Sequence, residues 1–89
     1  MAALLAVGTT TASSDDFTLT GEATSLFLVA ATAPLSPSAQ AVIEVKSAAG
    51  VYFTVGTLSA TIAPMLVLSG PGTYRVTRYA GVSSGVDRV

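Results

Sequence analysis

The sequence predicts an all-β protein: an antiparallel β-sandwich or small barrel, jelly-roll or immunoglobulin-like, of about seven or eight short strands with an N-terminal arm. Three observations lead to this prediction. Apolar and polar residues alternate with a period of two, turn-forming residues recur about every ten residues, and no window has the apolar spacing of a long helix. We expect a single domain at residues 15–89, preceded by residues 1–14 as an arm or a first strand, because 89 residues allow only one core.

The N-terminal residues 1–7 are apolar and uncharged. A secretory signal needs a basic segment before its apolar stretch, and the first basic residue here is Lys46. We therefore expect a protein made without a signal peptide, in which this segment is an extended arm or a strand. No stretch approaches the roughly 20 apolar residues of a membrane span, so we expect no membrane partner.

Two strand candidates precede the first proline-rich loop. Residues 17–20 alternate and then meet Gly21, which is typical of a strand with one buried face and a closing turn. Residues 26–31 are apolar on both faces, and a strand of this kind needs a covering on each side. Residues 33–38 carry two prolines and are predicted to form a loop.

A hairpin is predicted in the middle of the chain. In residues 40–46 the odd-numbered apolar residues are expected to face the core, with Glu44 and Lys46 on the solvent side. A turn at 47–50 leads into the β-prone residues 51–55, and Gly56 then indicates a bulge.

The C-terminal third holds three more strand candidates. Pro64 places the candidate at 62–68 at a sheet edge, because proline cannot donate a hydrogen bond to a neighbouring strand. A tight turn at 70–72 is followed by the alternating residues 73–79, and the tail is expected to form a short strand around Val86 or to stay mobile.

The composition argues against catalysis. The chain has no His and no Cys, so the commonest neutral-pH base, the commonest metal ligand and any thiolate nucleophile are missing. Asp15 and Asp16 are adjacent, and neighbouring strand residues point to opposite faces, so they are not expected to work as a catalytic carboxylate pair. We expect a non-enzyme without catalytic residues, metal or cofactor.

Charge excludes a further class of partner. Four basic side chains and a net charge of -1 do not neutralise a phosphate backbone, so we expect no nucleic acid partner. Charged residues make up 10% of the chain against about 25% in an ordinary soluble domain. Uncharged β-prone segments pair with one another unless they are covered. We therefore expect a homo-oligomer, a trimer or a larger assembly.

Polar candidates for a contact surface lie on the later strands. Arg75 is expected to face solvent or a partner carboxylate, whereas Arg78 is expected to lay its stem on apolar surface and extend its head into water. Tyr52 and Tyr79 combine an apolar ring with a polar tip, which suits interfaces. Together with the apolar segments, the candidate interface residues are Leu4, Leu5, Val7, Leu26, Leu28, Tyr52, Arg75 and Tyr79.

The segments 42–46, 51–56 and 66–76, the last containing Gly-Pro-Gly-Thr-Tyr-Arg, resemble small β-sandwich proteins of tailed bacteriophage particles. These are capsid decoration or cement proteins and related accessory domains, and the resemblance covers about half of the chain, residues 42–80. It implies a non-catalytic virion protein, made in the host cytoplasm, that binds and stabilises the head shell. The implied partners are the major capsid protein or other virion proteins, together with copies of the chain itself.

Two alternatives stay open. One is a structural component of the tail, neck or connector. The other is a receptor- or carbohydrate-binding module, for which Tyr52, Tyr79, Arg75 and residues 32–40 are the candidates. The uncharged residues 1–14 are also expected to serve as an arm that adds a strand to a neighbouring subunit.

Overall fold

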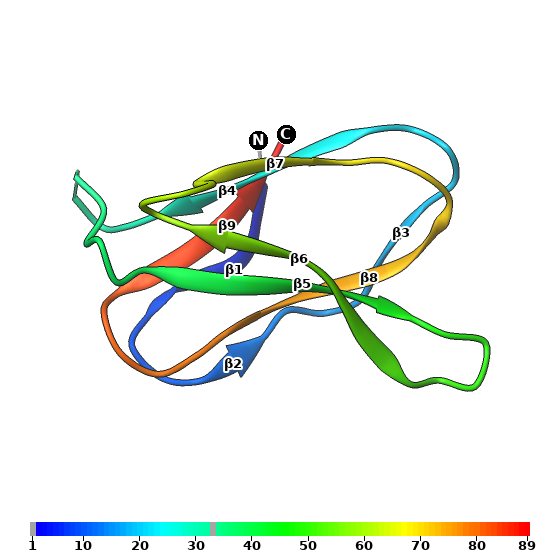
Figure 1. Cartoon of the computed structure of the whole chain (residues 1–89), viewed down its shortest axis with the longest axis horizontal. Helices are drawn as coiled ribbons and strands as arrows, with labels where there is room; N and C mark the ends of the chain where they lie inside the picture. Colours follow the sequence, from blue (N-terminus) through cyan, green and yellow to red (C-terminus); the bar gives the residue numbers. More distant parts are fainter. Residues whose placement is uncertain (1, 33) are drawn as a thin grey trace.

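The computed structural model describes residues 2–32 and 34–89. Nine strands of this part form two antiparallel sheets (Figure 1), which confirms the predicted all-β sandwich. The strands are β1 (Ala2–Gly8), β2 (Ala12–Ser13), β3 (Phe17–Leu19), β4 (Thr24–Val29), β5 (Gln40–Lys46), β6 (Tyr52–Ser59), β7 (Met65–Leu68), β8 (Gly72–Arg78) and β9 (Ser84–Arg88).

The first sheet, sheet A, has the strand order β1-β9-β4-β7. The second, sheet B, has the order β2-β8-β5-β6, and β3 also pairs with β8. The strands β6 and β7 are therefore edge strands of different sheets, and they follow one another in the chain. They lie side by side along one side of the sandwich, where a bridge joins Ser59 to Ala63 at the turn between them.

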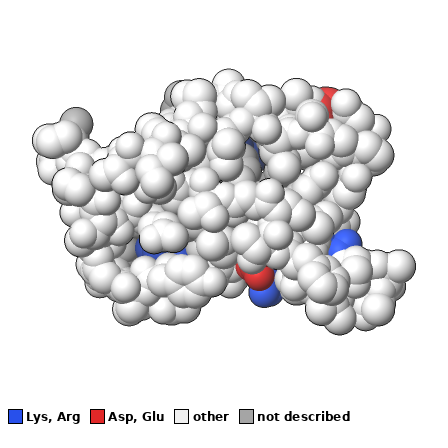
Figure 2. All heavy atoms as spheres, in the orientation of Figure 1, with Lys and Arg blue, Asp and Glu red and all other residues white. Residues whose placement is uncertain are grey.

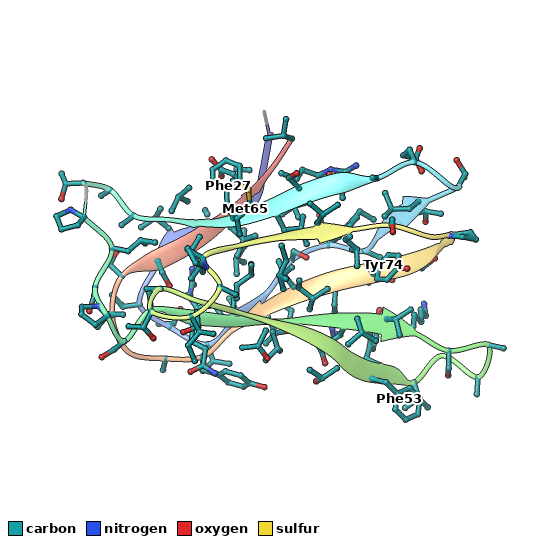
Figure 3. All side chains as sticks on the ribbon, turned by 45° about the horizontal axis from the view of Figure 1, so that its top comes forward. Phe27, Phe53, Met65 and Tyr74 are labelled. Carbon is teal, nitrogen blue, oxygen red and sulfur yellow. The ribbon has the colours of Figure 1, made fainter. Side chains whose placement is uncertain are left out.

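The core lies between the sheets and follows from the alternation of each strand. Inward-facing residues of both sheets are buried, and Tyr74 lies among them between the two sheets (Figure 3). Each fully buried leucine or isoleucine contributes about 1.5–3 kcal/mol through the removal of apolar surface from water. The core residues are Leu5, Phe17, Leu19, Leu26, Leu28, Ala39, Ala41, Ile43, Leu58, Tyr74, Val76 and Val86.

The β5–β6 hairpin has the predicted bulge. Ile43 pairs with Gly56 whereas Glu44 pairs with Thr54, so Val55 is an extra residue without a partner on β5. Beyond the bulge the hairpin projects past the rest of the sandwich (Figure 1). On the β6 side of this part of the hairpin, Val51, Phe53 and Val55 are each more than half exposed.

The C-terminal tail is a central strand. Of the two expectations for residues 82–89, a short strand is correct, and β9 lies between β1 and β4 with Val86 fully buried. Gly85 allows the close approach of β1, because a Cβ there would lie 2.6 Å from the carbonyl oxygen of Leu5. Gly85, which weakens the strand pattern in the sequence, is thus needed for the close contact between β9 and β1.

The N-terminal segment also belongs to the sandwich. Residues 2–8 form β1, which pairs with β9 through Ala3 opposite Asp87 and Leu5 opposite Val86. Residues 12–13 form β2 on the edge of β8. Of the two alternatives for this segment, the structure has a strand of the chain's own sheet, and residues 2–13 do not extend away as an arm. Within the described residues, no helix is long and apolar enough to cross a membrane.

Candidate interaction surface

One side of the sandwich is built from strands that carry no charged residue. The two edge strands β6 and β7 lie here, and the chain has no charged residue between Lys46 and Arg75. Figure 2 shows few charged atoms on the face that it presents, across which β6 and β7 run in Figure 1. We call β6, β7 and the residues that flank them, residues 51–72, the uncharged side.

The uncharged side carries most of the large apolar side chains that are exposed in the described part of the chain. Each is more than half accessible to solvent, although single exposed apolar residues are ordinary on protein surfaces. A group of them on neighbouring edges is typical of an interaction site. They are Val51, Phe53, Val55, Ile62, Met65 and Val67.

These edges have a bulge, a short strand and a proline as protection, but no charge. Natural edge strands are usually blunted by lysine, proline, bulges or short length, because their unpaired backbone groups attract other strands. Strand β6 has the bulge at Val55, and β7 is four residues long and follows Pro64. Neither strand has a charged residue. The side thus lacks the charged side chains that would oppose contact with an apolar surface of another protein.

The apolar surface continues onto the outer face of sheet A. Phe27 of β4 lies directly opposite Met65 of β7, and the two side chains lie next to one another on the outside of the sheet (Figure 3). Ser25 lies opposite Val67 in the same way. The outer face of β4 therefore widens the patch beyond the edge.

The outer face of sheet B is different, because its charges are paired within the chain. Arg75 Nε donates to Glu44 Oε1 at 3.0 Å, and the hydroxyl of Thr77 donates to the same oxygen at 2.6 Å. The hydroxyl of Thr77 and the guanidinium of Arg75 together hold the pKa of the Glu44 carboxyl below its usual range. Arg75 thus has its carboxylate partner inside the molecule.

Tyr52 belongs to the same network. Its hydroxyl donates to Asp16 Oδ1 at 2.6 Å, and this carboxylate raises the pKa of the Tyr52 phenol. The guanidinium of Arg75 lies 3.6 Å from the centre of the Tyr52 ring, and Lys46 Nζ lies 3.6 Å from Asp16 Oδ2. One ring face is therefore covered by Arg75, which leaves Tyr52 a poor platform for stacking a sugar.

Tyr79 lies apart from this network, at a small hollow. The hollow has a volume of about 210 Å³ and is lined by Tyr79, Ser38, Gln40, residues 80–82 and Ser84. Its lining is uncharged and combines an exposed aromatic ring with an amide and hydroxyl groups. The structure thus brings Tyr79 together with the end of the 32–40 segment, and it separates Tyr79 from Tyr52 and Arg75.

Several expected interface residues are core residues instead. Leu5, Leu26 and Leu28 are buried between the sheets, and Leu4 is half-buried and packs against the core. In the doubly apolar segment 26–31, the leucines face inward because strand residues alternate between faces. Within the candidate list, Val7 and Tyr79 remain as exposed apolar or aromatic side chains.

The candidate list omitted the exposed apolar residues of the two edge strands. Phe53 and Met65 are more than half exposed, and Val67 is two-thirds exposed. The sequence signal that could have found them is the long interval without charge between Lys46 and Arg75, combined with the edge position that Pro64 predicts.

Arg78 is also placed differently from the expectation. Its side chain is 5% exposed, so the head does not reach out into water. Its Nε donates to the carbonyl of Thr10 at 2.8 Å, and its Nη1 donates to those of Ala6 at 2.6 Å and Ser84 at 2.8 Å. These three carbonyls come from β1, from β9 and from the loop after β1. Arg78 therefore joins the two sheets, and it is a structural residue instead of a surface contact.

The described residues include no group of three or more Asp, Glu, His or Cys side chains that could hold a metal ion. No protein-family model, no curated protein and no solved structure matches this chain. The chemistry of its own surfaces is therefore the basis for a functional assignment.

Proposed function

We propose that this chain is a non-catalytic structural protein of a phage particle, a capsid decoration or cement protein that stabilises the head shell. The observation that carries the proposal is the uncharged side, where exposed apolar residues occupy two neighbouring edge strands. Such a surface lowers its free energy when another protein covers it. The resemblance of residues 42–80 to phage accessory proteins supports a shell as that protein.

A cement function needs only binding energy. Each copy that covers several shell subunits adds cohesion by mass action, and no reactive group is required. The projecting β5–β6 hairpin suits this role, because Phe53 lies on it (Figure 3) and both Phe53 and Val51 are more than half exposed, where a shell subunit can reach them. Aromatic residues of this kind carry a large share of the binding energy in protein interfaces.

The proposal predicts that purified particles of the phage that encodes this chain contain it in many copies. Phe53→Asp is expected to lower its occupancy on the particles at least about tenfold, because a charge would be buried in an apolar contact. Occupancy is measured by quantitative mass spectrometry of particles, and image reconstruction locates the 8.9 kDa chain.

Thr18→Asp is the matched control, since Thr18 is exposed on β3, away from the uncharged side. It is expected to bind particles as the unaltered chain does. Absence of the chain from washed particles would contradict the proposal, and so would equal loss of binding by both variants. A position on the tail, neck or connector would support that alternative structural role instead.

A second candidate function is supported by the hollow at Tyr79. An aromatic ring beside Gln40 and Ser38, without charge, has the chemistry that a neutral sugar ring requires. Reproducible hits on a glycan array that disappear in Tyr79→Ala would favour this receptor-binding role over the shell.

A further inference from the structure

Strand β7 has a free backbone edge. The amide of Leu28 donates to the carbonyl of Pro64 at 2.9 Å, one residue beyond the pair Phe27 and Met65 that ends the β4–β7 register. In an antiparallel pair, hydrogen-bonded positions alternate with positions whose N–H and C=O groups point the other way. Leu66 and Leu68 thus bond to β4, whereas the backbone groups of Met65 and Val67 point away from the sheet.

We propose that β7 pairs antiparallel with β7 of a second copy, with Leu66 opposite Leu66 at a two-fold axis. This inference goes beyond the proposed function, because it names a contact between two copies of the chain. In this register, Met65 of one copy lies opposite Val67 of the other, and both pairs exchange two N–H···O=C bonds. All of the free groups on the described β7 edge then have partners.

Neighbouring registers are less favourable. If the two-fold axis moved to Met65, Ala63 would have to pair with Val67 of the second copy. The backbone groups of Ala63 already bond to Ser59. If the axis moved to Val67, Met65 would have to pair with Ser69, which lies beyond the end of β7. A shift by one residue would place outward-facing side chains opposite inward-facing ones. The centre at Leu66 uses β7 residues alone and keeps both faces consistent.

The side chains fit the same arrangement. Met65 and Val67 are 56% and 67% exposed on the outer face, and pairing places each against the other residue of the second copy, beside Phe27. On the inner face, the two half-buried Leu66 side chains meet and extend the cores toward one another. Apolar cross-strand pairs of this kind stabilise a sheet by about 0.2–1 kcal/mol each.

The absence of charge in β6 and β7 favours a copy of the same chain as the partner. A two-fold contact sets each surface against itself, so any charge near the axis would face its like. Neither strand carries a charge, and nothing on them would select an acidic or a basic partner. An edge that is self-complementary in hydrogen bonding and carries no charge is suited to a second copy.

The first test removes the Val67 N–H, which points away from the sheet and would donate to the second copy. Val67→Pro removes this outward donor without removing a β4 hydrogen bond, because proline is tolerated at an outward-facing edge position. The matched control Val67→Ala keeps the donor. Sedimentation equilibrium of the purified unaltered chain is expected to show a dimer, and Val67→Pro is expected to raise the dissociation constant at least about tenfold more than Val67→Ala does.

Disulfide cross-linking tests the same contact even if the proline variant fails to fold. The chain has no cysteine, so Met65→Cys and Val67→Cys each introduce one thiol. Under mild oxidation, a mixture of the two is expected to give a disulfide-linked heterodimer in clear excess over linked homodimers, because residues 65 and 67 lie opposite one another. A monomer at all concentrations, a trimer, or equal linking in every combination would overturn the proposal. Particle occupancy plays no part in either measurement, so this proposal and the shell proposal fail separately.

Discussion

Arg75 and Arg78 lie on the same strand, β8, three residues apart and therefore on opposite faces of sheet B. Arg75 is on the outer face, where Glu44 pairs with its charge. Arg78 is on the inner face, where three backbone carbonyls surround its guanidinium and the described residues supply no carboxylate partner. An arginine stays protonated when it is buried, so these carbonyls must compensate the lost hydration.

This difference predicts that replacement by methionine lowers the free energy of unfolding more at Arg78 than at Arg75. Arg78→Met is expected to lower the free energy of unfolding by about 3 kcal/mol, because it breaks charge-assisted hydrogen bonds and leaves carbonyls without a donor. Arg75→Met breaks a partly exposed pair and is expected to cost about 1 kcal/mol or less. Urea unfolding of both variants measures the costs, and equal losses would show that Arg78 does not join the sheets as described.

Ionisation of the Glu44 carboxyl makes the stability of the fold depend on pH. Its pKa is lower in the folded chain than the usual 4.5, because the hydroxyl of Thr77 and the guanidinium of Arg75 favour the charged form. The unfolded chain therefore binds more protons than the folded chain between the two pKa values. The stabilisation is present above pH 4.5 and is lost as the pH falls through the folded pKa.

We therefore expect the free energy of unfolding to decrease as the pH falls below about 4.5, with a smaller decrease in Glu44→Gln. Thr20 also lowers the pKa of the exposed Glu22 through hydrogen bonds, so the slope does not vanish in that variant. Urea unfolding at pH 6 and pH 3 measures the difference. An unchanged pH slope in Glu44→Gln would contradict the assignment.

At the scale of elements, β1 and β9 depend on one another. Strand β1 supplies Leu5 to the core and the Ala6 carbonyl to Arg78, and it covers the outer edge of β9. Two glycines allow this fit: a Cβ at Gly8 would lie 2.9 Å from Arg78 Nη2, and one at Gly85 would meet the Leu5 carbonyl. An N-terminal strand with these contacts is part of the fold.

Deletion of residues 1–8 is therefore expected to lower the free energy of unfolding by at least about 4 kcal/mol, which is most of the stability of a domain this small. Thermal unfolding followed by circular dichroism measures the loss. Val7→Ser is the control, because Val7 is exposed and its replacement is expected to change stability by about 0.5 kcal/mol or less. A truncated chain of unchanged stability would support the arm alternative for this segment.

At the scale of the whole molecule, the few charges of the chain are unevenly placed. Lys46, Asp16, Glu44 and Arg75 gather on the outer face of sheet B, where they pair with one another. The edges at β6 and β7 receive none. With a net charge of -1, the molecule has little electrostatic repulsion to keep copies apart, and this agrees with the pairing that we propose for β7.

The sequence alone determined the class of fold, because periodicity, glycine and proline act locally. The bulge at Gly56 and the edge position implied by Pro64 are both confirmed. The alternation of residues 40–46 is seen only in part, because Val42 is buried as well as Ala41 and Ile43. The alternation of residues 73–79 also puts Arg78 on the same face as Tyr74 and Val76, although the sequence did not show that its guanidinium is buried.

Only the tertiary structure decided which surfaces are free. Leu26 and Met65 both lie in runs of apolar residues, yet Leu26 is fully buried and Met65 is exposed, because β4 is a central strand and Met65 faces outward on an edge. The order of strands in a sheet depends on pairings between distant residues, which no local pattern encodes. For the same reason, the place of β9 beside β1 and the carbonyls around Arg78 emerged only from the folded chain.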